Sequence, residues 1–198
     1  MIRPLYFHNP NQEGFEAIIK HLHSKNYKFI SIEELYSRLE KNDTKGKLAY
    51  ISFDDGWQGN LKLIPIIEKY NVHITIFIAV NPIMSGNFWW EFVAKKVGYT
   101  QMQNFKNLPH DEFESQLKKI KTEVADLQRS AMTIDELETI TKHPLISIQS
   151  HTINHPILTK LPDDLLDFEL SESQKQLEKI TGKSIFAFSY PNGSISHR

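Results

Sequence analysis

The hydrophobic positions of the chain follow two periods, one typical of strands and one typical of helices. Between short apolar runs, apolar residues recur at helical spacing, as in Phe15, Ile18, Ile19 and Leu22. Strands that alternate with helices favour parallel βαβ units, in either an open doubly wound sheet or a closed barrel. The predicted strands, rich in β-branched or aromatic residues, cover residues 5–7, 48–53, 74–79, 145–148 and 185–188.

The regular alternation stops between residues 81 and 130. After a polar connection, this segment has an amphipathic pattern from Phe113 to Leu127 that predicts a long helix. We therefore expect a single domain over residues 1–198, with a helical insertion at about 81–130. Two Ser/Thr-x-x-Glu capping boxes mark the starts of other helices: Ser31 with Glu34, and Thr133 with Glu136.

The composition is that of one globular domain that can bury a full core, because 40% of the 198 residues are hydrophobic and 24% are charged. The net charge is -1 and no stretch gathers the basic residues, so nothing favours nucleic acid or an anionic membrane as a partner. The longest apolar run, residues 74–80, is far shorter than the roughly 20 residues that span a bilayer. The first residues form no apolar signal region, so we expect a cytoplasmic protein, or a secreted one if the chain has been trimmed.

Residues that can bind a metal follow two of the predicted strands. Asp54 and Asp55 follow the second strand, and His151 and His155 follow the fourth. Taken separately, an Asp-Asp-Gly sequence is usually a turn, and two histidines four residues apart can lie on one face of a helix without binding a metal. Both motifs, however, follow a strand, where α/β folds place their chemistry. Since His nitrogen and carboxylate oxygen bind divalent ions, and a further carboxylate can deprotonate a bound water, the set indicates a mononuclear metal hydrolase.

The expected topology brings these motifs together. The carboxyl ends of parallel strands share one face of a sheet or barrel. That face would also hold the turn at residues 190–193, and His8 if the run at residues 5–7 is the first strand. The chain has no cysteine, so a metal bound there would have only nitrogen and oxygen ligands.

Three segments resemble the sequence motifs of the polysaccharide deacetylases, a family of the carbohydrate esterase class whose members share the NodB homology domain. The segments are Ile51–Gly56, Ser150–Pro156 and Phe188–Gly193, and they occur in the order of the family. The resemblance implies an α/β fold, a deformed (β/α) barrel. Because the chain stops at Arg198, soon after the third motif, we expect this barrel to lack its last strands.

The resemblance also implies a role for each motif residue. One divalent metal ion, zinc in most members, would be bound by Asp55, His151 and His155. Asp54 would be the general base that takes a proton from the attacking water, and the backbone N–H of Asn192 would stabilise the oxyanion. Pro191 would set the turn that aims this N–H group.

The chain departs from the family pattern in two respects. Ser189 stands where many members have an arginine that orients the base. The chain also ends before the segments in which many members place a further aspartate and the histidine that protonates the leaving amine. We expect His8 to be this acid, because a branch of the family that acts on exported poly-N-acetylglucosamine has a histidine in a similar place. A capping role for His8, and an acid role for His197, are the alternatives.

Four residues are candidates for substrate binding: Tyr190, Pro191, Trp89 and Trp90. The two tryptophans belong to a Phe-Trp-Trp triplet that resembles an aromatic stretch of many bacterial members. Their rings could stack on a sugar, although adjacent aromatic residues usually include a core residue.

We interpret the chain as a metal-dependent hydrolase that removes N-acetyl groups from an amino sugar in a polysaccharide, oligosaccharide or sugar intermediate. The alternatives are hydrolysis of another non-peptide C–N bond, in a small amide or a cyclic imide, and a noncatalytic saccharide-binding module. A barrel without its last strands exposes a sheet edge, which favours pairing with another chain. Self-association into a homo-oligomer is therefore a further hypothesis.

Overall fold

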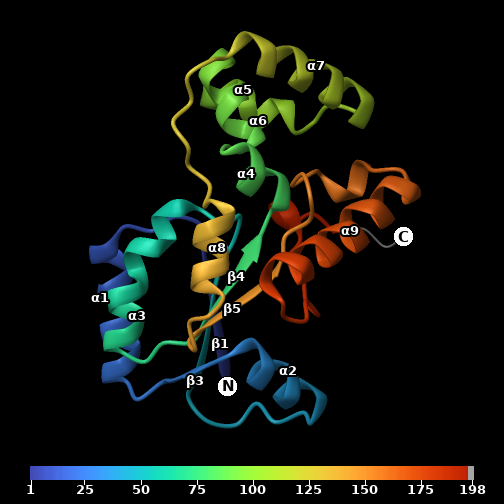
Figure 1. Cartoon of the computed structure of the whole chain (residues 1–198). Coiled ribbons are helices and arrows are strands. Elements are labelled where there is room, and N and C mark those ends of the chain that lie inside the picture. Colours follow the sequence, from blue (N-terminus) through green and yellow to red (C-terminus); the bar gives the residue numbers. More distant parts are fainter. Residues whose placement is uncertain (196–198) are drawn as a thin grey trace.

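The computed structural model describes residues 1–195 and contains a five-stranded parallel β-sheet (Figure 1). The strands are β1 (Ile2–Phe7), β2 (Lys28–Ile30), β3 (Leu48–Phe53), β4 (Ile74–Ile78) and β5 (Ile146–Ser150). Their order is β1-β3-β4-β5, and β2 pairs with the first half of β3. Because every pair is parallel, all the strands end on the same side of the sheet.

Helices pack around the sheet and beyond its carboxyl end. They are α1 (Gln12–Ser24), α2 (Ile32–Glu40), α3 (Ile64–Lys69), α4 (Val80–Ser85), α5 (Trp89–Val97), α6 (Tyr99–Phe105), α7 (His110–Glu123), α8 (Ile134–Ile140) and α9 (Asp163–Thr181), with short 3-10 turns η1 (Gln58–Leu63), η2 (Leu158–Lys160) and η3 (Pro191–Gly193). Helices α1 and α3 lie on one side of the sheet, and α9 packs against β5 (Figure 1). Within residues 1–195, no helix is both long enough and apolar enough to cross a membrane.

Strand β3 lies inside the sheet and is buried on both faces. Its six residues are all buried, and successive side chains point to opposite faces. Ala49, Ile51 and Phe53 join the main apolar cluster, which includes residues of α1, α3, α8 and α9. Leu48 and Tyr50 join a second cluster on the other face. Strands of parallel sheets are covered on both faces, so their sequences are nearly continuous apolar runs, as in β3.

Helices α5, α6 and α7 form a separate layer above the strand ends, with an apolar cluster of their own (Figure 1). The cluster consists of Trp89, Val93, Met102, Phe105, Phe113, Leu117 and Ile120. The segment predicted as a polar connection contains α6, which the sequence analysis missed because only Met102 and Phe105 of this helix are buried. Helix α7 ends at Glu123, before the predicted end at Leu127.

The last predicted strand is also corrected by the structure. Residues 185–188 do not form a named strand, and only an isolated parallel bridge joins Phe188 to Ser150 at the end of β5. Backbone hydrogen bonds continue the contact, from Ser150 N–H to the Ala187 carbonyl and from Ser189 N–H to the Ser150 carbonyl. This short pairing still places the third motif next to β5.

Candidate metal centre

Three metal-binding side chains meet at the carboxyl ends of β3 and β5. Asp55 Oδ1 lies 3.4 Å from His151 Nε2 and 3.3 Å from His155 Nε2. All three side chains are buried, and one ligand atom from each lies within 4.8 Å of the others. The predicted convergence of the Asp55 and His151/His155 motifs is therefore present in the fold.

Hydrogen bonds orient two of these side chains, Asp55 and His151, as ligands. His151 Nδ1 lies 2.9 Å from the Ser189 carbonyl oxygen, which can only accept, so Nδ1 carries the proton. In the neutral ring, Nε2 is then an unprotonated acceptor that faces Asp55. Trp57 Nε1 donates to the other carboxylate oxygen of Asp55, Oδ2, at 2.8 Å. Asp55 Oδ1 itself has no hydrogen-bond partner among the described residues.

This arrangement fits a divalent cation. His151 Nε2 and Asp55 Oδ1 are both acceptors, so at this separation they need a positive charge between them. Ligands held about 2.1 Å from a tetrahedral ion are about 3.4 Å apart, close to the separations of Asp55 Oδ1 from the two Nε2 atoms. Two imidazoles and one carboxylate also form a donor set typical of zinc sites that keep a position open.

The electrostatics of the buried centre agree with this fit. Burial alone would raise the pKa of Asp55, but the imidazoles of His151 and His155 outweigh it and hold the pKa well below its usual range. Burial lowers the pKa of His155, against the opposing effect of Asp55. An ionised carboxylate and a neutral imidazole are the forms that bind metal.

Ligand-bearing loops adopt strained backbone conformations. Asp55, Thr152 and His155 have φ values of 76°, 71° and 55°, in the left-handed region that side chains other than glycine rarely adopt. A β-branched threonine is particularly unfavourable there. Such strain persists where the surroundings hold it, and it is concentrated at functional sites.

Buried side chains stabilise the loop between the two histidines. Glu169 of α9 accepts hydrogen bonds from the backbone N–H groups of Ile153 and Asn154 at 2.8 and 2.9 Å, and from Asn154 Nδ2 at 2.6 Å. Thr152 Oγ1 accepts from the His155 N–H group at 3.1 Å. Glu169 was not predicted as a site residue, because nothing local in the sequence distinguishes it from the other acidic residues of its helix.

Asp54 lies beside the centre and faces a cavity. Burial raises the pKa of Asp54 above its usual value, and the neighbouring His151 ring has the opposite effect. The Ser189 hydroxyl lies 3.5 Å from Asp54 Oδ2, at the limit of a hydrogen bond. A weak hydroxyl contact thus takes the place of the arginine that many members have at this position.

The cavity has a volume of about 1000 Å³ and joins the strand ends to the α6–α7 segment. Four of the predicted catalytic and substrate-binding residues line it: His8, Asp54, Tyr190 and Asn192. The lining residues that were not predicted from the sequence include Tyr6, Gln103, Lys106 and Lys160. The two lysines come from segments whose approach to the site depends on tertiary packing alone.

The remaining predicted residues have other surroundings. Trp89 is 5% exposed, and its Nε1 donates to the His155 carbonyl at 3.1 Å, so the structure corrects its predicted sugar contact to a core position. Pro191 is also buried and does not line the cavity, in contrast to its predicted contact with substrate. Trp90 is half-buried, stacked on Phe88 and next to the His155 ring. His197, the alternative acid, lies outside the described residues.

The fold and the site define a class of protein: a parallel α/β domain whose strand ends form a candidate metal centre beside a second carboxylate. The sequence profile described as polysaccharide deacetylase matches residues 41–198. The chain belongs to this family. It is 24% identical over 186 residues to YxkH of Bacillus subtilis strain 168, a polysaccharide deacetylase by name. The match covers 93% of this chain and 50% of YxkH, so the chain spans about half the length of that relative.

Solved structures show the same fold. The Streptococcus pyogenes deacetylase PplD, in complex with acetate, has a TM-score of 0.68 at 19% identity, over 99% of this chain and 75% of PplD. A polysaccharide deacetylase from Bacillus cereus has a TM-score of 0.67 at 20% identity, over 99% of this chain and 52% of that protein. The expected fold class, the deformed (β/α) barrel of the polysaccharide deacetylases, is confirmed.

Proposed function

We propose that this chain is a metal-dependent hydrolase that removes N-acetyl groups from an amino sugar in a polysaccharide, oligosaccharide or sugar intermediate. The convergence of Asp55, His151 and His155 beside Asp54, at the base of a large cavity, is the observation that carries the proposal. Family membership supports it. So does the acetate bound in the PplD structure, because acetate is the product of N-deacetylation.

The proposed metal is zinc, held by Asp55, His151 and His155. A divalent ion there would supply Lewis acidity for the acetamide carbonyl and for a water molecule. Asp54 accepts the proton of the attacking water at its carboxylate. Burial raises the pKa of Asp54, so its carboxylate is a stronger base than an exposed aspartate.

The other proposed roles belong to residues that line the cavity. The backbone N–H of Asn192 donates to the developing oxyanion, and Asn192 has a left-handed conformation (φ 59°) within the turn after Tyr190. The C–N bond then breaks, and His8 gives a proton to the amine that leaves. His8 follows β1, where its carbonyl accepts a hydrogen bond from Asn60 Nδ2 at 2.8 Å.

Two linked measurements test this proposal. Elemental analysis after dialysis against trace zinc should find about one ion per chain, and His151→Ala should lose it because one of three ligands is removed. His21→Ala, an exposed histidine of α1, is the matched control and should keep the ion. Absence of metal from the unsubstituted chain would contradict the proposal and favour a noncatalytic saccharide-binding module.

Acetate release from N-acetylglucosamine oligomers then tests the reaction. The zinc-loaded chain should release acetate, and Asp54→Asn should retain the ion but lose turnover, because the amide cannot accept the proton. Small amides and cyclic imides should be tested alongside. Turnover of these compounds without acetate release from the sugars would replace the deacetylase proposal with hydrolysis of another C–N bond.

A further inference from the structure

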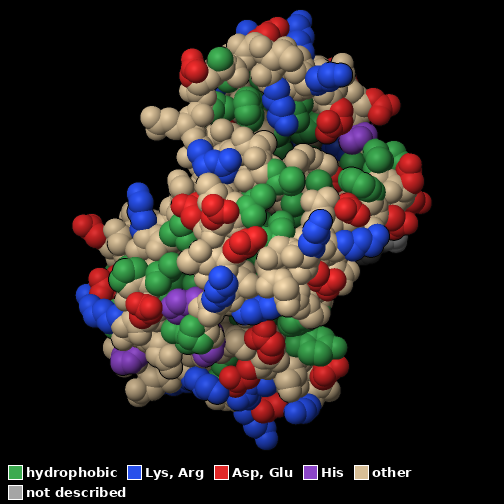
Figure 2. Space-filling model, in the orientation of Figure 1, with side chains coloured by type: hydrophobic (Ala, Val, Ile, Leu, Met, Phe, Trp, Pro, Cys, Tyr) green, Lys and Arg blue, Asp and Glu red, His purple; other side chains and the backbone are tan. Residues whose placement is uncertain are grey.

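The cavity above Asp54 has an uneven distribution of charge. Lys106, which follows α6, and Lys160, at the end of η2, both line it and are both half-buried. Among the described lining residues, Asp54 is the only acidic one. By contrast, the one face of the molecule drawn in Figure 2 shows acidic and basic side chains interspersed, in agreement with a net charge of -1. The excess of positive side chains is therefore a property of the cavity.

The two lysines are held differently. Lys160 Nζ donates to the carbonyls of Lys106 and Leu108 at 2.7 and 2.9 Å, and so ties the α6–α7 loop to the rim of the cavity. Carbonyls carry no full charge, so these two hydrogen bonds do not neutralise the ammonium charge of Lys160. The Lys106 ammonium has no hydrogen bond or ion pair within residues 1–195, and its only described electrostatic partner is Asp55.

Asp55 cannot serve as a full counterion to Lys106. Its carboxylate already contacts His151, His155 and Trp57. Burial lowers the pKa of Lys106, against the opposing effect of Asp55, which indicates an ammonium with incomplete hydration. A partly desolvated cation without a counterion gains most from a negatively charged hydrogen-bond acceptor.

We propose that Lys106 and Lys160 form an anion subsite, through which the cavity selects N-acetylated saccharides that carry a carboxylate or a phosphate near the acetylated sugar. This inference rests on the proposed deacetylase function. The cavity volume of about 1000 Å³ lies at the upper end of ligand pockets, so it has room for a substituent beside the reacting sugar. Lys106 is the specificity-determining residue, and Lys160 holds the loop that carries it.

Binding to the Asp54→Asn protein tests the subsite without turnover. Titration calorimetry would compare three ligands: a neutral N-acetylglucosamine disaccharide, the same disaccharide with an N-acetylmuramic acid carboxylate, and a phosphorylated form. We expect the best acidic ligand to bind about tenfold more tightly than the neutral one, as for one charge-assisted hydrogen bond. The carboxylate and phosphate arms identify which anion is recognised.

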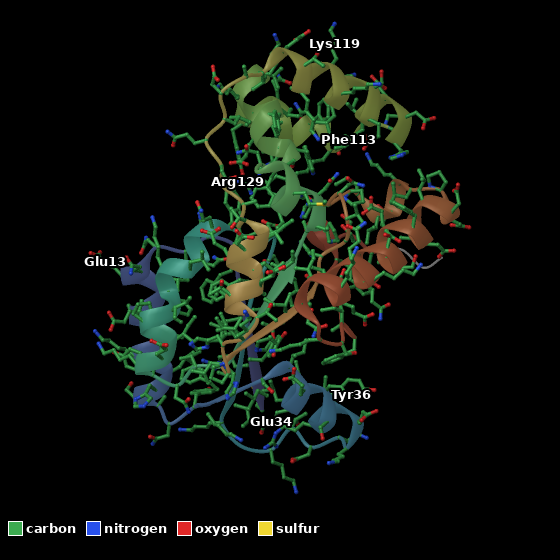
Figure 3. All side chains as sticks on the ribbon, in the orientation of Figure 1. Glu13, Glu34, Tyr36, Phe113, Lys119 and Arg129 are labelled. Carbon is green, nitrogen blue, oxygen red and sulfur yellow. The ribbon has the colours of Figure 1, made fainter. Side chains whose placement is uncertain are left out.

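Substitutions at Lys106 assign the effect. Lys106→Gln should remove the preference for the acidic ligand, and Lys106→Arg should retain it. Lys119→Gln makes the same change of charge on the outer side of α7, where Figure 3 shows Lys119 away from the sheet, and should leave the preference unchanged. Equal affinity for neutral and acidic ligands, or a preference that survives Lys106→Gln, would overturn the proposal.

Two further readouts separate this inference from the proposed function. The preference of the Asp54→Asn protein should fall as salt is raised, and this measurement needs no lysine variant. Acetate release from the neutral disaccharide by the unsubstituted chain tests the reaction alone. Acetate release combined with equal binding of all three ligands would leave the deacetylase standing and remove the subsite. A preference for the acidic ligands without any acetate release would leave the subsite standing and remove the deacetylase proposal.

Discussion

The strand-end metal centre and the α5–α7 insertion are stabilised in different ways. At the centre, polar groups hold the ligands: Trp57 for Asp55, the Ser189 carbonyl for His151, and the buried Glu169 for the loop before His155. The insertion is stabilised by its apolar cluster, with few polar ties to the rest of the chain. The comparison suggests that reactivity and substrate selection can be changed separately.

The largest effect on acetate release is expected from loss of the metal. Treatment with a chelator, or Asp55→Asn, removes a contribution of several kcal/mol to the transition state, so the rate should fall about a thousandfold. Acetate release and metal content measure both changes. Asp135→Asn, an exposed aspartate of α8, should affect neither. Full activity in the metal-free chain would refute the role of the centre.

The next largest effect is expected from Glu169→Ala. The substitution leaves the backbone N–H groups of Ile153 and Asn154 without their acceptor, which should cost about 1–3 kcal/mol of unfolding free energy. Metal affinity should fall about 10- to 100-fold, as for other groups that orient ligands. Competition with a chelating dye measures the affinity. Glu172→Ala, whose carboxylate contacts Gln176 on the same helix, should not change it.

A smaller effect on the reaction is expected from Phe113→Ala in the insertion. Phe113 is 6% exposed and lies on the inner side of α7 (Figure 3), in contact with Trp89 and Phe105. The cavity left by the ring should destabilise the insertion by about 3–5 kcal/mol and speed amide hydrogen exchange in α5–α7. KM should rise while metal content stays the same. Loss of metal would instead show that the two regions are coupled through Trp89.

The smallest effect concerns Glu34, on α2, which Figure 3 shows far from the insertion. Burial tends to raise the pKa of Glu34, but hydrogen bonds from Lys28 and Arg38 outweigh it, and the pKa lies below 4.5. The ionised Glu34 carboxylate therefore contributes fully to the free energy of unfolding above pH 4.5. This contribution is lost as the pH falls through the lower pKa of the folded state. Solvent screening limits it to about 1 kcal/mol or less.

Denaturant unfolding at neutral and acidic pH measures this contribution, with Glu34→Gln as the variant that lacks it. The difference in unfolding free energy between the two proteins should shrink at the lower pH. A difference that stays constant with pH would contradict the assignment. Metal content at neutral pH should be the same in both proteins, because α2 contributes no residue to the centre.

Local sequence pattern determined several features of this chain. Thr133 and Glu136 form the complete predicted capping box, because both partners lie within one helical turn. At Ser31 only half of the predicted box is present, since the Glu34 carboxylate binds Lys28 and Arg38 instead. The capping serine and the helix start were predictable from four residues, but the competing partners were not.

The convergence of the two motifs was also predictable from the sequence, because parallel strands end on the same side and both motifs come soon after a strand, β3 or β5. The family resemblance then assigned Asp55, His151 and His155 as the ligands. Tertiary structure alone decided that Trp89 belongs to a core, that Glu169 holds the histidine loop, and that Lys106 faces the cavity. The reason is physical. Strand position follows from the local hydrophobic period, whereas these three residues depend on contacts between segments far apart in the chain, which no local period encodes.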